Sequence, residues 1–177
     1  MVVLQKAVID TGVLFTVLLL NYIRQAYLPD PKHTNTLAKL DDRELQFSEH
    51  RQEAYLRLLS GIRTPLITSH VIGELQGLQI SRLQLHGEDL RHFWMHSVDY
   101  LLTRSFDERL VRLLDVSGTV EWRETVGSVG PPDTGLIHLA LAERCPLLTD
   151  DARTLAGRAR QAGVECFLAR ELVNAYP

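Results

Sequence analysis

The chain has 177 residues, 45% of them hydrophobic and 23% charged, and a net charge of −3 at pH 7. This composition fits one ordinary globular domain and excludes a disordered, fibrous or strongly basic nucleic-acid-binding chain. A nucleic-acid substrate would have to be attracted by local basic clusters, because the average surface is mildly acidic. The two cysteines, Cys145 and Cys166, have no metal-type spacing, so we expect reduced core thiols in a cytoplasmic protein.

The N-terminal segment predicts a strand followed by a buried helix. The run from Lys6 to Ile9, with two valines before it, indicates a short buried strand that ends at Asp10. A helix is expected from Gly12 to about Ala26, buried early and polar late. Its apolar run, Val13 to Leu20, is too short to span a bilayer, so we predict a core helix and no membrane anchor.

Helix and strand patterns alternate through the middle of the chain. In chain order we expect a loop from Pro29 to Leu40, a helix from Asp41 to about Gly61, a strand at Pro65–Thr68, and helices at Ser69–Gln79, Glu88–Thr103 and Asp107–Leu114. Ser69 is a good N-cap for the helix that it begins. No motif assigns a role to the stretch from Ser81 to Val129.

The C-terminal third alternates most clearly. After the break at Gly130-Pro131-Pro132 we expect a helix (Thr134–Arg144), a strand (Leu147–Thr149), a helix (Asp151–Ala162), a turn at Gly163, a strand (Val164–Phe167) and a short last helix. Strands that alternate with helices indicate a single α/β domain over residues 1–177 with a mostly parallel sheet.

Acidic residues fall where such a sheet gathers its ligands. Asp10 and Asp151 follow predicted strands, Asp133 begins a helix directly after the Pro-Pro break, and Glu74 lies about one turn into the helix from Ser69. The carboxyl ends of parallel strands and the helix starts beside them lie at one edge of the sheet. The sequence therefore places these acids near that edge.

The helix phase of these acids points inward. Asp133 is followed by apolar residues at offsets of three, four, seven and eight, the offsets of a core-facing stripe, and Glu74 has Val71 and Leu78 at the same kind of spacing. Asp151 has apolar residues four and eight positions later, which favours it over Asp150 as the inward acid and leaves Asp150 as a helix cap or an outer support. Several ionised carboxylates that point toward one core repel one another and imply a bound cation.

Each acid also has an ordinary structural explanation. An aspartate at a helix start is commonly an N-cap, which accounts for Asp10 or Asp133 singly, and Glu74 taken alone is typical of a half-buried, paired acid. His70 and His138 flank acids in the sequence and could support the carboxylates, although surface or packing positions are more typical of such histidines. The four acids together carry the metal-site hypothesis.

Four strings of the sequence resemble the PIN domains, a superfamily of small α/β nucleases. "VIDTGVL" is similar to the opening of the family, "SHVIGEL" to the helix after its second strand, and "DTGLIHLALAERCPLLTDD" with "AGVECFLARELV" to its closing half. The likeness covers both ends of the chain. The segment around 29–61 looks like a longer helical insertion than in compact members, and residues 122–129 match nothing in the family.

The resemblance implies a three-layer sandwich and a metal-dependent nuclease site. Asp10, Glu74, Asp133 and Asp151 match the four acidic positions of the family, and Thr11 and Thr149 match hydroxyls that support them. One or two Mg²⁺ or Mn²⁺ ions would be held by Asp10 and Asp133 most directly, together with Asp151. Carboxylates suit these hard cations, which can activate water and neutralise phosphate charge.

Substrate and partners are also expectations from the resemblance. Single-stranded or looped RNA is the expected substrate, and a homodimer and an antitoxin partner are typical of toxin members, whereas other members process RNA. Arg153, Arg158 and Arg160 could contact RNA, although a solvated helix face is the simpler explanation for them. The alternative function is a PIN-like module that binds RNA or protein without cutting it.

Overall fold

The computed structural model describes residues 4–27, 49–78, 85, 87–112, 115–116 and 120–174. Within these residues a single five-stranded sheet has the order β3-β2-β1-β4-β5. Its strands are β1 (Leu4–Ile9), β2 (Ile62–Thr68), β3 (Asp107–Arg109), β4 (Leu147–Thr149) and β5 (Cys166–Leu168). All neighbouring pairs are parallel, which confirms the predicted α/β fold with its parallel central sheet.

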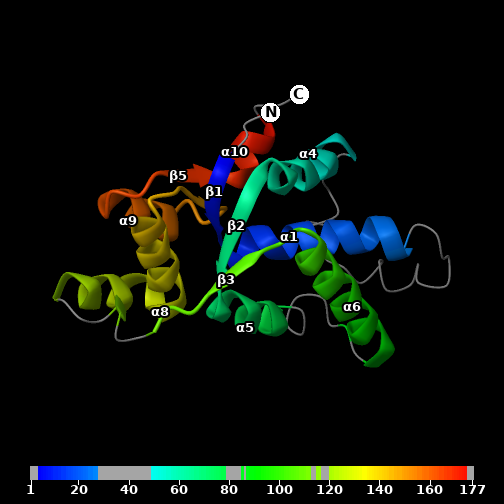
Figure 1. Ribbon diagram of the computed structural model, residues 1–177, viewed down its shortest axis with the longest axis horizontal. Coiled ribbons are helices and arrows are strands. Elements are labelled where there is room, and N and C mark those ends of the chain that lie inside the picture. The colour runs from blue at the N-terminus through cyan, green and yellow to red at the C-terminus, as the bar shows by residue number, and fades with distance from the viewer. Residues whose placement is uncertain are drawn as a thin grey trace.

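Helices cover both faces of the sheet (Figure 1). One layer contains α1 (Thr11–Tyr22) with its π-helical extension η1 (Ile23–Tyr27), α4 (Glu49–Ser60), α5 (Ser69–Leu78), α6 (Gly87–Thr103) and α10 (Ala169–Asn174). The other layer contains α8 (Val120–Glu143) and α9 (Leu155–Gln161), which contact each other and the strands of the opposite face. The result is a three-layer sandwich.

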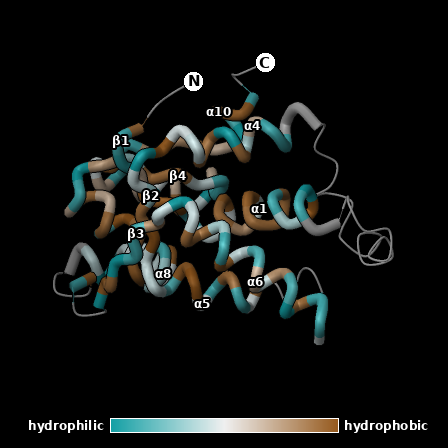
Figure 2. The backbone as a smooth tube through the Cα atoms, turned by 45° about the vertical axis from the view of Figure 1, so that its right-hand side comes forward, coloured by the Kyte–Doolittle hydropathy of each residue, from teal (hydrophilic) through white to brown (hydrophobic). Residues whose placement is uncertain are grey.

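Helix α1 is the centre of its layer. It contacts α4, α5 and α6 as well as β4, so it is enclosed on nearly every side. Its side chains are accordingly buried from Val13 to Tyr22 apart from the half-buried Thr16, and the expected polar end lies in η1, where Arg24 and Gln25 are exposed. Figure 2 shows the contrast with α6, whose outer face is hydrophilic. The predicted core helix is thus confirmed, and it ends four residues before the predicted Ala26 as a regular α-helix.

The predicted break at Gly130 is a kink inside α8. Gly130 has φ 86° and ψ 166°, a conformation open essentially to glycine alone. Pro131 and Pro132 follow it and lack the N–H groups that would continue the first helix. The Thr134 hydroxyl donates to the Gly130 carbonyl oxygen at 2.7 Å and so helps to begin the second half of the helix.

The predicted helix at Asp107–Leu114 is wrong. Asp107, Glu108 and Arg109 instead pair with Leu66, Ile67 and Thr68 as the edge strand β3. Open hydrogen-bonding groups on the edge of β2 pair with this short segment, and such pairing overrides a weak local helix pattern.

The segment around 29–61 lies partly outside the described residues. Its loop and the start of its helix at Asp41 fall there, whereas α4 is described and contacts α10, α1 and β2. None of the described helices combines the length and the apolar character needed to cross a membrane.

Candidate carboxylate site

The site lies where the strand order reverses. β1 has β2 on one side and β4 on the other, and Asp10 follows β1 directly. Crevices at such switch points, beyond the carboxyl ends of the strands, are the usual ligand sites of parallel α/β sheets. The pairing of Ile9 with Leu148 puts Asp10 beside Thr149.

Asp10 is a buried carboxylate held by a hydroxyl. It is 9% exposed, and Thr149 Oγ1 donates to its Oδ2 at 2.6 Å. Burial raises the pKa of Asp10, the Thr149 hydroxyl and nearby backbone N–H groups oppose that shift, and the charge of Glu74 adds to it. Within the described part of the chain no lysine or arginine forms an ion pair with Asp10.

Glu74 approaches from the helix that follows β2. Thr11 Oγ1 donates to Glu74 Oε2 at 2.5 Å, which ties the first turn of α1 to α5. Thr11 and Thr149, the two hydroxyls expected to support the site, thus each hold one oxygen of an acid.

Asp133 comes from the opposite layer. The second half of α8 runs back along β1, and at its far end Lys6 Nζ donates to Glu143 Oε2 at 2.7 Å. Asp133 lies ten residues before Glu143, about 15 Å along a helix, and Asp10 lies four residues after Lys6, about 13 Å along a strand. The Lys6–Glu143 ion pair therefore fixes the alignment that brings Asp133 toward Asp10.

The charges of the other three acids act on Asp133. Burial, and after it the charges of Asp10, Glu74 and Asp151, together raise its pKa to about 7. No described lysine or arginine forms an ion pair with Asp133 or with these three acids. The edge of the sheet thus carries negative charge that no described cationic side chain neutralises.

Asp151 also stabilises the turn that leads into α9. Its carboxylate accepts the N–H groups of Arg153 at 3.0 Å and Thr154 at 2.9 Å, and the Thr154 hydroxyl at 2.6 Å. Burial would raise the pKa of Asp151, but these hydrogen bonds outweigh it and the pKa is lowered. Its charge reaches Asp133 while its oxygens hold the turn before α9.

Asp150 faces the other helical layer. Its oxygens accept the Tyr55 hydroxyl at 2.9 Å and the Arg170 N–H at 2.9 Å. It therefore joins α4 and the start of α10, and the sequence expectation of a cap fits it, although for α10 rather than α9.

The four acids are coupled but do not form a finished coordination shell. Among the described residues no three His, Cys, Asp or Glu side chains are grouped closely enough to hold a metal ion. The two observations are compatible, because charges interact over distances far greater than the 2.0–2.6 Å or so of a metal–oxygen bond. The candidate ligands fit a hard divalent cation, since all of them are carboxylate or hydroxyl oxygens. No described lysine or arginine forms an ion pair with the carboxylates.

Thr68 is a neighbour of the site that the sequence analysis did not single out. It ends β2, is fully buried, and its Oγ1 has no hydrogen-bond partner within the described structure. Continuing the β1–β2 register from Val8 and Leu66 puts Thr68 opposite Asp10. The available signal was a hydroxyl in the last position of a strand, the same place that Thr149 occupies in β4.

The three candidate substrate arginines lie on or before α9 and are exposed. Arg158 donates to the Gln161 side chain at 3.2 Å and Arg160 donates to the Cys166 carbonyl oxygen at 3.2 Å. Both arginines therefore form hydrogen bonds within α9 or to β5. Arg153, two residues after Asp151, lies nearest to the acids along the chain. His70 is exposed. The His138 ring packs against the Trp122 ring, with the two ring centroids 5.5 Å apart.

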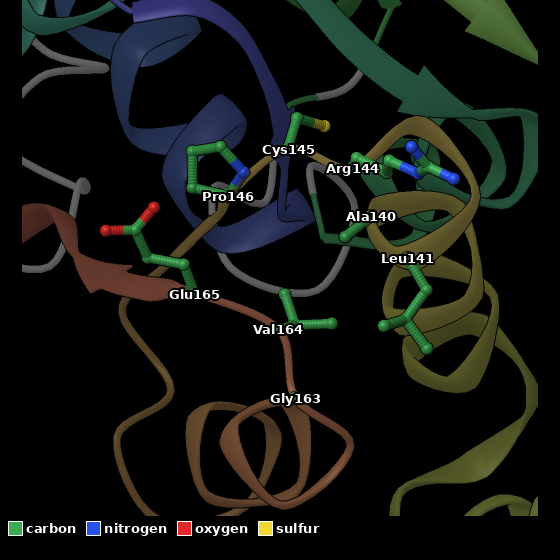
Figure 3. A pocket seen from close by; sticks show the side chains of 8 residues that line it. All are labelled: Ala140, Leu141, Arg144, Cys145, Pro146, Gly163, Val164 and Glu165. Atoms are coloured by element: carbon green, nitrogen blue, oxygen red, sulfur yellow. The ribbon is translucent and has the colours of Figure 1, made fainter.

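A surface cavity of about 290 Å³ lies at the amino ends of β4 and β5, at the other end of the strands from the acids (Figure 3). Its walls come from the end of α8 and from the residues that lead into β4 and β5, including Arg144, Cys145 and Glu165. None of the four acids lines it. Cys145 is half-buried there and Cys166 is buried, and both thiols are free.

Comparisons of the chain with protein-family models, with curated proteins and with solved structures give no match. The residues of the site and the resemblance of the sequence strings are therefore the basis for a function. The fold alone does not select a function, because parallel α/β sheets support many chemistries.

Proposed function

We propose that the protein is a divalent-metal-dependent nuclease of the PIN type that hydrolyses phosphodiester bonds of RNA. The observation that carries the proposal is the raised pKa of Asp133, to about 7, caused by burial and by the charges of three other acids. A cluster of like charges without a cationic partner is costly, and a bound divalent ion would relieve it.

The chain's own residues supply positioning for this chemistry. Thr149 holds one oxygen of Asp10 through a buried hydrogen bond, and Thr11 holds one oxygen of Glu74 through a half-buried one, so the other oxygen of each acid is oriented. Asp133 must lose its proton to act as a ligand, and Asp151 contributes charge from the start of α9. When bound, one or two Mg²⁺ or Mn²⁺ ions would lower the pKa of a water molecule and neutralise phosphate charge.

RNA as the substrate, an antitoxin partner, a homodimer and a cytoplasmic location belong to the same proposal. They follow from the resemblance of "VIDTGVL", "SHVIGEL" and the closing half to the PIN family. Toxin and RNA-processing roles use the same site, so the chemistry proposed here serves either.

A cleavage assay tests the proposal. The protein is incubated with structured and unstructured RNAs in Mg²⁺, in Mn²⁺ and in EDTA, alongside the Asp10→Asn and Asp150→Asn variants. We expect divalent-dependent cleavage that Asp10→Asn lowers at least a hundredfold, because it removes a charged ligand. Asp150→Asn is the matched control and should retain activity, since Asp150 bonds Tyr55 and Arg170. Equal cleavage in EDTA or by Asp10→Asn would contradict the proposal.

A second function, binding without cleavage, is favoured by a different observation. The Asp151 oxygens are occupied by the turn before α9, and the described acids do not form a ready metal group. Calorimetric titration with Mn²⁺ separates the two functions. A nuclease should show saturable Mn²⁺ binding that is lost in Asp10→Asn, whereas a binding module should show none.

A further inference from the structure

A second cavity, of about 390 Å³, opens between three helices far from the four acids. It is walled by the end of α1 with η1, by α4, and by the end of α6. α1 begins beside Asp10 and spans 12 residues, about 18 Å, before it reaches this cavity. The cavity is therefore separate from the carboxylate site, and the inference below does not depend on the proposed function.

Three arginines from different segments line this cavity. They are Arg24 in η1, Arg57 in α4 and Arg104 directly after α6. One carboxylate, Glu53, also lines it and pairs with Arg57 at 2.7 Å. No carboxylate of the described residues forms an ion pair with Arg24 or Arg104. The lining therefore has an excess of positive charge in a protein whose net charge is −3.

Helix dipoles explain part of this arrangement. Arg24 and Arg57 lie in the last turns of their helices, and Arg104 follows the end of α6. A cation at a helix C-terminus is stabilised by the dipole, which accounts for each arginine singly. The dipoles give no reason for three arginines from three segments to line one cavity.

A tyrosine ring holds one of these arginines in place. Tyr100 lines the same cavity and is 7% exposed, and the Arg104 guanidinium lies over its ring, 5.5 Å from the centroid. Burial raises the pKa of Tyr100, and the Arg104 charge with its hydrogen bond to the tyrosine opposes that shift. A cation stacked on an aromatic ring is stabilised by it, so this contact orders the Arg104 side chain beside the cavity.

We infer that this cavity is a binding site for a phosphate-bearing anion. Arginine forks match the oxygens of a phosphate group, and groups from three directions can contact several of its oxygens together. A volume near 390 Å³ lies at the small end of ligand pockets, which suits inorganic phosphate or a mononucleotide. The shared chemistry is the phosphate group, whether free or part of an RNA strand.

Calorimetric titration of the full chain at low salt tests the inference. The probes are inorganic phosphate, a nucleoside 5′-monophosphate, the corresponding nucleoside and a single-stranded RNA octamer, all with EDTA present. We expect the phosphate-bearing probes to bind and the nucleoside to fail. The Arg24→Gln/Arg104→Gln variant should weaken phosphate binding at least tenfold, and preference for the octamer over the mononucleotide would assign the phosphate to a polymer.

Two further variants keep the test decisive. Arg63→Gln/Arg91→Gln removes two exposed charges elsewhere and should bind phosphate like the wild type. Arg24→Lys/Arg104→Lys keeps both charges but loses the fork, so it should bind with intermediate affinity and its circular dichroism should match the wild type. Undetectable binding of every phosphate probe, or equal binding by Arg24→Gln/Arg104→Gln, would overturn the inference.

Discussion

At the scale of single residues, hydroxyl groups determine how the acids are held. Thr149 is fully buried, donates to Asp10 at 2.6 Å and accepts the Asp151 N–H at 3.0 Å. One hydroxyl thus joins the end of β1 to the residue that stabilises the turn leading into α9. An isosteric residue without the hydroxyl would leave both partners unsatisfied.

The Thr149→Val variant should therefore be less stable than the wild type by about 1–3 kcal/mol, the usual cost of leaving buried polar groups without partners. Urea denaturation followed by circular dichroism measures the change. Thr149→Ser retains the hydroxyl and should lose less. A Thr149→Val protein as stable as the wild type would show that the hydrogen bond to Asp10 contributes nothing.

The raised pKa of Asp133 predicts how stability depends on pH. In the unfolded chain this carboxyl ionises near 3.8, whereas in the folded protein it keeps its proton to about 7. The folded state binds more protons between these values, so the stability contribution is full below about pH 4 and is lost as the pH rises to about 7. Asp133→Asn should flatten this slope and be more stable than the wild type at pH 8, as thermal melts in EDTA would show. A variant that melts below the wild type at pH 8 and keeps the full slope would contradict the assignment.

At the scale of elements, Asp151 has two roles that a pair of substitutions can separate. It caps the turn before α9 through three hydrogen bonds of 3.0 Å or less, and its charge acts on Asp133. Asparagine keeps a cap oxygen but removes the charge, and alanine removes both.

Asp151→Ala should cost about 0.5–2 kcal/mol of stability, the range for losing an N-cap, and Asp151→Asn should cost clearly less. Both should lower divalent-dependent cleavage, because neither has the negative charge. Urea titrations and cleavage rates measured on the same preparations make the comparison. If Asp151→Asn cleaves like the wild type, the carboxylate is a cap alone and does not belong to the metal set.

At the scale of the whole molecule, the distribution of charge matters more than its sum. Because the protein has a net charge of −3, the proposed RNA binding would require local basic groups, and those closest to the acids along the chain can be tested first. Arg153 and Arg158 are exposed and close in sequence to Asp151, whereas Arg160 is bonded to the β5 backbone.

RNA binding by the inactive Asp10→Asn protein tests these two arginines. Adding Arg153→Gln/Arg158→Gln should lower the slope of log K against log salt by about 1.4 if each contacts one phosphate of a single strand. The same charge loss at Arg63 and Arg91 should leave the slope unchanged. An unaltered slope in the first variant would assign Arg153 and Arg158 to a solvated helix face.

The sequence by itself determined the elements whose patterns are local. β4 lies at the predicted Leu147–Thr149, Ser69 begins α5, and glycine and two prolines break α8 at Gly130, because such patterns depend on neighbouring residues. Thr11 and Thr149, which the resemblance to PIN domains singled out, donate hydrogen bonds to Glu74 and Asp10, and their role in a site stays a prediction.

Only the tertiary structure decided the features that depend on distant segments. Residues 107–109 form a strand because the edge of β2 is available to pair with them, and no local pattern reports that edge. The Asp150 side chain accepts hydrogen bonds from the Tyr55 hydroxyl, 95 residues away in the sequence, and from the Arg170 N–H. Thr68 lies opposite Asp10 because of the register between β1 and β2. Helix phase and composition describe only a residue's own helix or strand. The charges that act on Asp133 belong to Asp10, Glu74 and Asp151 on other segments, so the packing between layers decides their effect.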